Sequence, residues 1–380
     1  IPPAITGVTQ VCAGNTTTLY NSLPGGTWSS SNPSIASIDP FGVVSGIISG
    51  VVTISYTSAT TGCPVTTTVT VNGLPAPISG PGNICVGNTA LYASSTPGGT
   101  WSSSNTLIAS ILPASGLAGG IAPGTANIIY TLPTGCSAQK PITVNAIPSG
   151  ITGSPVLCVG STTSLSNPAP GGTWSSTGTF VATVDPATGV VTGVAAGNPN
   201  ITYLMATGCF AVQNITVNPS PSAISGPTAV CTGASITLSD VSGGGSWSSS
   251  SSGLATVGST GIVTGVAAGN PVISYALPTG CFSVMTATVN AVAPIAGTTS
   301  ICIGNTATLS DATGSGSWGS SNTSVATISG SGVVSTVAVG STTISYTVSS
   351  MGCSAIRTEY VTNIPHVFAL TGGGAYCSGG

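Results

Sequence analysis

Cysteines are the residues of this chain whose type and spacing best support chemistry. Thiols held at fixed spacing either form disulfides or bind zinc. The chain has no Cys-x-x-Cys motif and a single histidine, so disulfides in an oxidising compartment outside the cytoplasm are the expected chemistry. The first cysteine of each set is Cys12, Cys85, Cys158, Cys231 or Cys302, the second is Cys63, Cys136, Cys209, Cys281 or Cys353, and Cys377 opens a sixth set.

Other groups that catalyse reactions are too sparse to form a site. The only histidine is His366, so no repeat can pair one of its many serines with a base. The aspartates Asp39, Asp185, Asp240 and Asp311 stand one to a repeat, which leaves no carboxylate pair for glycoside cleavage and no calcium loop. The sequence therefore predicts no enzyme, no cofactor and no metal site.

The cysteines mark a tandem array with a period of about 73 residues. A tryptophan follows each first cysteine at a constant distance, at Trp28, Trp101, Trp174, Trp247 and Trp318. Superposing the sets predicts repeats at 1–73, 74–146, 147–219, 220–290 and 291–362, and the start of a divergent sixth repeat at 363–380. Short proline-bearing links join the repeats, and stiff links of this kind predict close coupling between neighbours.

The composition excludes several classes of partner. Charged residues make up 2% of the chain, against roughly 25% in an ordinary soluble domain. Because there is no basic patch, nucleic acid is not expected as a partner. No apolar run approaches the ~20 residues of a membrane helix, so no membrane span is expected either.

Within the third repeat, short runs rich in β-branched residues alternate with turn signals. Such runs are 162–166, 181–184, 189–192, 200–203 and 213–217, and the glycines at Gly171 and Gly172 turn the chain into the tryptophan strand. About seven short strands per repeat are typical of a two-sheet antiparallel sandwich. The predicted fold class is therefore all-β.

The sequence GTWSSSNPSIASIDPFGVVSG of the first repeat, followed by GVVTISY and TTTVTVN, resembles the bacterial immunoglobulin-like domain of the group 2 type. All five repeats share this pattern, and the cysteine pair is an addition to it. The resemblance implies tandem immunoglobulin-like β-sandwiches forming an extended rod. It also implies a very long surface protein of the Bacteroidetes type, in which the present chain is an internal piece.

The tryptophans have an interpretation in the core and one in binding. A tryptophan one strand after the first apolar strand usually fills the core of such a sandwich. A binding site would need polar company on a loop, and a run of serines gives little. We therefore expect Trp28, Trp101, Trp174, Trp247 and Trp318 to pack in the core.

Two disulfide pairings are open. Pairing within a repeat would join Cys12 to Cys63, Cys85 to Cys136, Cys158 to Cys209, Cys231 to Cys281 and Cys302 to Cys353. The inferred strand order places the two cysteines of one repeat at opposite ends of the sandwich, which favours pairing between consecutive repeats. That alternative joins Cys12 to Cys136, Cys85 to Cys209, Cys158 to Cys281 and Cys231 to Cys353, and leaves Cys63 and Cys302 for repeats beyond this stretch or just entering it.

These observations favour a structural role, as an extracellular stalk or filament on or shed from a bacterial surface and rigidified by disulfides. With so little charge, copies of the chain have little repulsion between them, and lateral or end-to-end self-association is expected. Two alternatives remain open. The repeats could form an adhesin that binds glycan, ice or another surface through their Ser/Thr-rich faces, or they could be the spacer of a larger surface enzyme.

Overall fold

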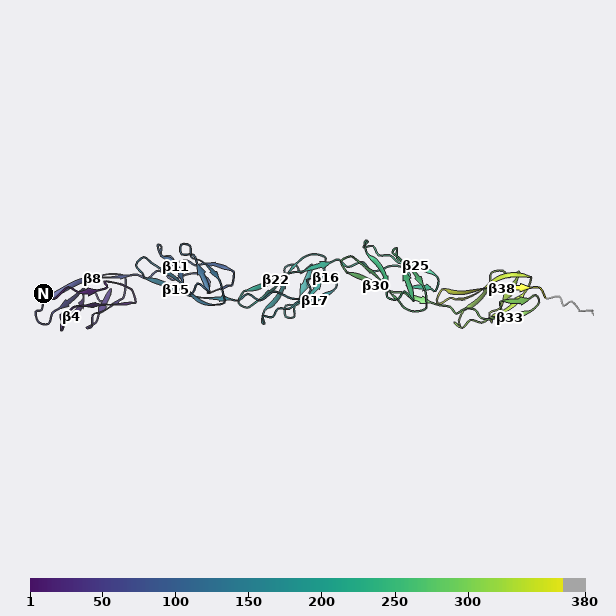
Figure 1. Cartoon of the computed structure of the whole chain (residues 1–380), viewed down its shortest axis with the longest axis horizontal. Coiled ribbons are helices and arrows are strands. Elements are labelled where there is room, and N and C mark those ends of the chain that lie inside the picture. Colours follow the sequence, from purple (N-terminus) through teal and green to yellow (C-terminus); the bar gives the residue numbers. More distant parts are fainter. Residues whose placement is uncertain (365–380) are drawn as a thin grey trace, which may run out of the picture. The chain divides into compact units, whose positions relative to one another are not determined.

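The computed structural model describes residues 1–364, and all regular elements in this part are β-strands (Figure 1). This confirms the predicted all-β class. The predicted sixth repeat, with Cys377 and His366, lies outside the described residues apart from its first two positions.

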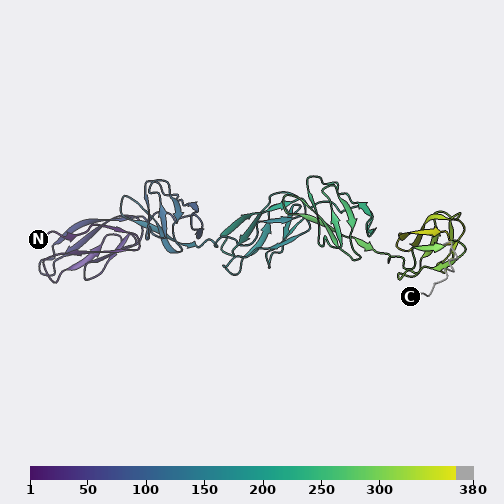
Figure 2. The same cartoon turned by 45° about the vertical axis from the view of Figure 1, so that its right-hand side comes forward.

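The first repeat is a sandwich of two four-stranded sheets (Figure 2). One sheet has the order β1-β3-β6-β5 and the other β2-β8-β7-β4. The strands are β1 (Thr6–Gly7), β2 (Gln10–Cys12), β3 (Thr16–Tyr20), β4 (Thr27–Ser30), β5 (Ala36–Ile38), β6 (Val43–Gly46), β7 (Gly50–Thr57) and β8 (Pro64–Asn72). All pairs are antiparallel except β2 with β8, which run parallel and place Cys12 opposite Asn72.

The second repeat uses the same arrangement, with sheets β10-β13-β12 and β11-β14-β15-β9. Its strands are β9 (Asn83–Cys85), β10 (Thr89–Leu91), β11 (Thr100–Ser103), β12 (Ala109–Ile111), β13 (Leu117–Gly120), β14 (Gly124–Thr131) and β15 (Ser137–Asn145). The third repeat has β16 (Val156–Cys158), β17 (Thr162–Ser164), β18 (Thr173–Ser176), β19 (Ala182–Val184), β20 (Val190–Gly193), β21 (Asn200–Leu204), β22 (Phe210–Asn214) and β23 (Thr216–Asn218).

The fourth repeat has β24 (Ala229–Cys231), β25 (Ser235–Thr237), β26 (Ser246–Ser249), β27 (Ala255–Val257), β28 (Ile262–Gly265), β29 (Val272–Ala276), β30 (Phe282–Thr286) and β31 (Thr288–Asn290). The fifth has β32 (Ser300–Cys302), β33 (Thr306–Thr308), β34 (Ser317–Ser320), β35 (Ala326–Ile328), β36 (Val333–Thr336), β37 (Gly340–Val348) and β38 (Cys353–Thr362). In repeats two to five, the strand that carries the first cysteine again pairs parallel with the end of the last strand.

The chain divides into two compact units. The first comprises Ile1–Pro155, Thr163–Thr192 and Asn198–Ile215. The second comprises Val156–Thr162, Gly193–Gly197 and the chain from Thr216 onward. The third repeat therefore contributes strands to both units.

Alternation along the strands builds the core of each sandwich. In β7, Val52, Ile54 and Tyr56 are buried while the residues between them are partly exposed, which is the period of two expected of a strand with one face inward. The fully buried Ile128, Ile201, Ile273 and Ile344 are the counterparts of Ile54 in the other repeats. Each repeat thus closes its own small core.

The five tryptophans pack against these cores, but to different depths. Trp101 and Trp174 are 7% and 6% exposed, whereas Trp28, Trp247 and Trp318 are only half-buried. Each ring contacts a tyrosine of the neighbouring strand, with centroids 4.5–4.8 Å apart. The sequence predicted core packing for all five tryptophans and did not distinguish these depths.

The difference in tryptophan burial follows the length of one turn. This turn comes after β5 in the first repeat and after its counterparts β12, β19, β27 and β35 in the others. In the second and third repeats this turn is one residue longer than in the others, as in Asp185–Gly189 compared with Asp39–Gly42. The longer turn brings a proline carbonyl to the tryptophan, and the Trp174 amide donates to the Pro186 carbonyl at 3.0 Å. The two repeats with the longer turn are thus the two whose tryptophan is most buried.

Candidate functional site: the disulfide junctions

Each of the four disulfides joins one repeat to the next. Both cysteines of each disulfide lie in the same compact unit. The Cα atoms of each pair lie 5.6–5.7 Å apart, inside the usual range for a disulfide. The pairs are Cys12–Cys136, Cys85–Cys209, Cys158–Cys281 and Cys231–Cys353, with sequence separations of 122–124 residues. The structure therefore has the inter-repeat alternative.

Strand direction explains why a repeat does not close a disulfide on itself. Cys12 ends β2 opposite Asn72, the last residue of β8, whereas Cys63 directly precedes the first residue of β8. The nine residues of β8 run the length of the sheet, roughly 30 Å at 3.3 Å per residue. The two thiols of one repeat therefore lie far beyond disulfide range, while Cys136, which directly precedes the last strand of the next repeat, is within it.

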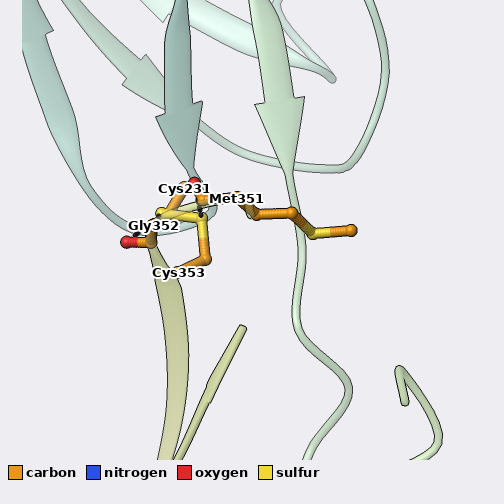
Figure 3. Close-up of a disulfide and its surroundings, with 4 residues drawn as sticks. All are labelled: Cys231, Met351, Gly352 and Cys353. Carbon is orange, nitrogen blue, oxygen red and sulfur yellow. Dashed lines mark hydrogen bonds between the residues drawn. A yellow bond between two sulfur atoms is a disulfide. The ribbon is translucent and has the colours of Figure 1, made fainter. Parts of the chain in front are cut away.

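Burial differs between the two partners of each junction. The second cysteines Cys136, Cys209, Cys281 and Cys353 are 0–3% exposed, and the first cysteines are half-buried. Figure 3 shows the last junction, where the Met351–Gly352 turn delivers Cys353 to the end of β24 and Cys231 Sγ lies 3.6 Å from the Gly352 carbonyl oxygen. Exchange with a thiol in solution requires access to a sulfur atom, so the half-buried first cysteine is the partner more open to attack.

Two cysteines of the described chain have no disulfide partner. Cys63 occupies the position of the buried second cysteines but is half-buried, and Cys302 occupies the position of the first cysteines. They are the two positions of the pattern whose partners would belong to a repeat before the first and a repeat after the fifth. Cys377 lies outside the described residues.

A hollow lies beside the tryptophan in the first, third and fourth repeats, and it is where the binding interpretation of the tryptophans can be tested. In the third repeat its polar groups are already used. The Tyr203 hydroxyl accepts from the Gly172 amide at 2.9 Å and donates to the Ala169 carbonyl at 2.5 Å. Asn167 donates to the Ser149 carbonyl and accepts from the Ala169 amide. These bonds fix the Gly-Gly loop, so the hollow has a structural explanation.

The fifth repeat carries a buried charge that sequence reasoning missed. Glu359 is fully buried, and neither carboxylate oxygen has a hydrogen-bond partner. Its contact is an ion pair of 3.5 Å with Arg357 Nε, whose other nitrogens donate to the Ile295 and Gly297 carbonyls. Burial raises the pKa of the Glu359 carboxyl, and the nearby Arg357 charge partly offsets this effect. The sequence contained a signal for this burial, because the equivalent position in the other four repeats holds an apolar residue: Val69, Ile142, Ile215 or Ala287.

The exposed Asp185 behaves in the opposite way. In the turn of the third repeat, Asp185 accepts hydrogen bonds from the Thr188 amide, the Thr188 hydroxyl and the Ala187 amide. These bonds lower the pKa of the Asp185 carboxyl because they stabilise its charged form. The carboxylate closes its own turn and is not part of a cluster.

Within residues 1–364, no group of three or more His, Cys, Asp or Glu side chains could hold a metal ion. In the same part of the chain, no helix is long and apolar enough to cross a membrane.

The sandwiches and their tryptophan–tyrosine packing define a class of protein, that of tandem immunoglobulin-like repeats. Residues 159–213, within the third repeat, match the family described as bacterial Ig-like domain (group 2). Disulfide-bonded cysteines lie on both sides of the matched residues, from Cys12 to Cys353.

One relative of known name is similar over most of the chain. Ice-binding protein 1 of Shewanella frigidimarina (strain NCIMB 400) is 29% identical over an alignment that covers 84% of this chain and 42% of that protein. The chain thus spans less than half the length of this relative.

Solved structures of other multidomain proteins are similar at low TM-scores. Invasin, a bacterial integrin-binding protein, is 13% identical with a TM-score of 0.28, covering 78% of this chain and 82% of that one. Domains 1–6 of the surface layer protein SbsC are 13% identical with a TM-score of 0.18, covering 97% and 67%. At these scores the similarity says nothing of what the chain does.

Proposed function

We propose that this chain is the stalk of an extracellular or surface-attached bacterial protein, without catalytic activity of its own. The observation that carries the proposal is the disulfide between consecutive repeats, present in the same geometry at four junctions. A disulfide inside a domain stabilises that domain, but one between domains restrains their relative motion. Its use at each of these junctions favours selection for a stiff array.

Small-angle X-ray scattering with and without a reductant tests the stalk. Under oxidising conditions we expect the scattering to fit a narrow range of overall dimensions among the molecules, because each junction is pinned by a covalent bond. Reduction should broaden the distribution while circular dichroism keeps its β-sheet signal. Identical scattering before and after complete reduction would show that the disulfides do not restrain the junctions.

A second candidate function is ice binding, which the name of the Shewanella frigidimarina relative suggests. The outer face of the β4-β7-β8 sheet in the first repeat favours it. On that face Thr27 lies opposite Thr57, Ser29 opposite Ser55, Ser55 opposite Thr66, and Thr53 opposite Thr68. Such an array of hydroxyl and methyl groups at the ~4.8 Å strand spacing could order water or contact a polysaccharide.

Ice recrystallisation inhibition separates the two functions. If the face binds ice, Thr66→Lys with Thr68→Lys should abolish inhibition, because two long charged side chains would prevent flat contact. Val212→Lys with Asn214→Lys places the same charges at the equivalent positions of the third repeat and should leave inhibition unchanged. An unmodified chain that shows no inhibition supports the stalk over the ice-binding surface.

A further inference from the structure

The disulfides divide each repeat into two parts with different covalent roles. We call the stretch from the second cysteine of one repeat to the first cysteine of the next a connecting segment. The stretch between the two cysteines of one repeat we call a body. The described connecting segments are 63–85, 136–158, 209–231 and 281–302, and the bodies are 12–63, 85–136, 158–209, 231–281 and 302–353.

Connecting segments and disulfides form covalent paths that bypass the bodies. One path passes from Cys12 to Cys136 through a disulfide and follows the chain to Cys158. It then crosses to Cys281 and follows the chain to Cys302. Residues 13–135 and 159–280 are not part of it. A second, interleaved path uses the Cys85–Cys209 and Cys231–Cys353 disulfides.

The connecting segments have little length in reserve. Each has about 22 residues, and a fully stretched chain spans at most 3.3–3.6 Å per residue. Segment 281–302 contains β30, β31 and β32, and strands already rise 3.2–3.4 Å per residue. Segment 63–85 likewise contains β8 and β9, joined by a proline-bearing link. Only local bends in the links, such as the one at Gly297 with its φ of +133°, can straighten further.

We propose that the chain is a tension-bearing tether, in which load passes along connecting segments and disulfides while the sandwich bodies stay unloaded. This inference rests on the stalk proposed above and names the load that the stalk carries. In a tandem array without disulfides, tension unfolds one domain after another and each releases its full contour length. Here a body that unfolds releases no length along a path, because its two cysteines lie on different paths and neither path runs through the body.

Force spectroscopy on the full chain measures this directly. Handles are attached through azide-bearing amino acids in place of Val8 and Asn305, which are both exposed. Cys63, Cys302 and Cys377 are changed to serine so that they cannot cross-link. The shortest covalent path between the handles has about 50 residues and two disulfides, so the oxidised chain should not exceed about 190 Å. It should show no unfolding steps.

Adding a reducing thiol under load should open the path. Each disulfide is cleaved by thiolate attack on one sulfur, which forms a mixed disulfide with the reductant and releases the other cysteine as a thiolate. The chain should then lengthen in discrete steps toward about 1,000 Å, the span of all the residues between the handles. Unfolding steps of whole repeats in the oxidised chain would overturn the proposal.

Two matched variants, each lacking one disulfide, distinguish the path from general stabilisation. Cys158→Ala with Cys281→Ala breaks the path between the handles and diverts it through about 125 residues, so steps totalling about 250 Å should appear. Cys231→Ala with Cys353→Ala removes one disulfide outside that path and should leave the record of the oxidised chain unchanged. Equal lengthening in both variants would contradict the load path.

The force experiment tests the load path separately from the proposed stalk function. Stepwise unfolding in the oxidised chain with reductant-sensitive scattering would leave a stalk that carries no load by this route. Ice recrystallisation inhibition that depends on Thr66 and Thr68 would replace the stalk function while leaving the force record intact. If a cysteine variant fails to fold, reduction of the unmodified chain under load still decides the question.

Discussion

At the scale of single residues, Glu359 is the position where the repeat pattern and the physical chemistry disagree. A carboxylate replaces a core Val, Ile or Ala and pairs with Arg357 at 3.5 Å, without hydrogen bonds to its oxygens. Replacing a buried ion pair by well-packed apolar residues is often neutral or stabilising by about 1–4 kcal/mol. Arg357→Gln with Glu359→Ile copies Gln213 and Ile215 of the third repeat and should stabilise the fifth by an amount in that range.

The pH dependence of the fifth repeat follows from the raised pKa of Glu359. A carboxyl whose pKa is higher in the folded state binds protons more tightly there, so its contribution to stability is complete at acid pH. That contribution is lost as the pH rises through the folded-state pKa. Hydrogen exchange of peptides from β38 should therefore be slower at pH 4 than at pH 7, after correction for the intrinsic rate. The double variant should lose this difference, and a difference retained in it would assign the effect to other groups.

At the scale of elements, we infer that the length of one turn sets how deeply a tryptophan is buried, because the longer turn and the deeper tryptophan occur in the same repeats. Deleting Ala187 from the third repeat gives its turn the length found in the first repeat. The Pro186 carbonyl should then lose its contact with the Trp174 amide, and Trp174 should become half-buried like Trp28. Hydroxyl-radical labelling read by mass spectrometry should show a several-fold rise in Trp174 oxidation. Trp101 keeps its long turn and serves as the control, and a matching rise there would indicate general loosening.

At the scale of the whole molecule, the outer strand faces of the third and fourth repeats are candidates for contact between copies. Phe210 and Phe282 are 52% and 63% exposed at equivalent positions, and charged residues make up 2% of the chain. Exposed apolar area with little charge promotes association. Phe210→Lys with Phe282→Lys should shift the chain to monomer in sedimentation velocity. Ser137→Lys with Ser354→Lys adds the same charge at the same position of two other repeats and should shift it much less.

The sequence by itself determined the all-β class and the immunoglobulin-like pattern, because both rest on local features. Alternating β-branched residues, glycine-bearing turns and a tryptophan at constant distance from a cysteine repeat in each period, and each period can close its own core. Strand order could also be argued from the sequence, and it favoured cysteine partners in consecutive repeats. It left the pairing open because disulfide formation depends on distances across a junction that no local pattern specifies.

Only the tertiary structure decided which thiols meet, how deeply each tryptophan lies and where a charge is buried. Cys12 and Cys136 are 124 residues apart in sequence and 5.7 Å apart at their Cα atoms, a proximity that requires β2 and β8 to run parallel and the next repeat to begin where they end. The deep burial of Trp174 accompanies one extra turn residue and a bond from its amide to the Pro186 carbonyl, and Glu359 owes its burial to the register of β38 against β37. The disulfide joins cysteines 124 residues apart, whereas the other two contacts join a strand to a nearby turn or to the next strand. In all three cases the outcome depends on how folded segments meet, which no local sequence pattern specifies.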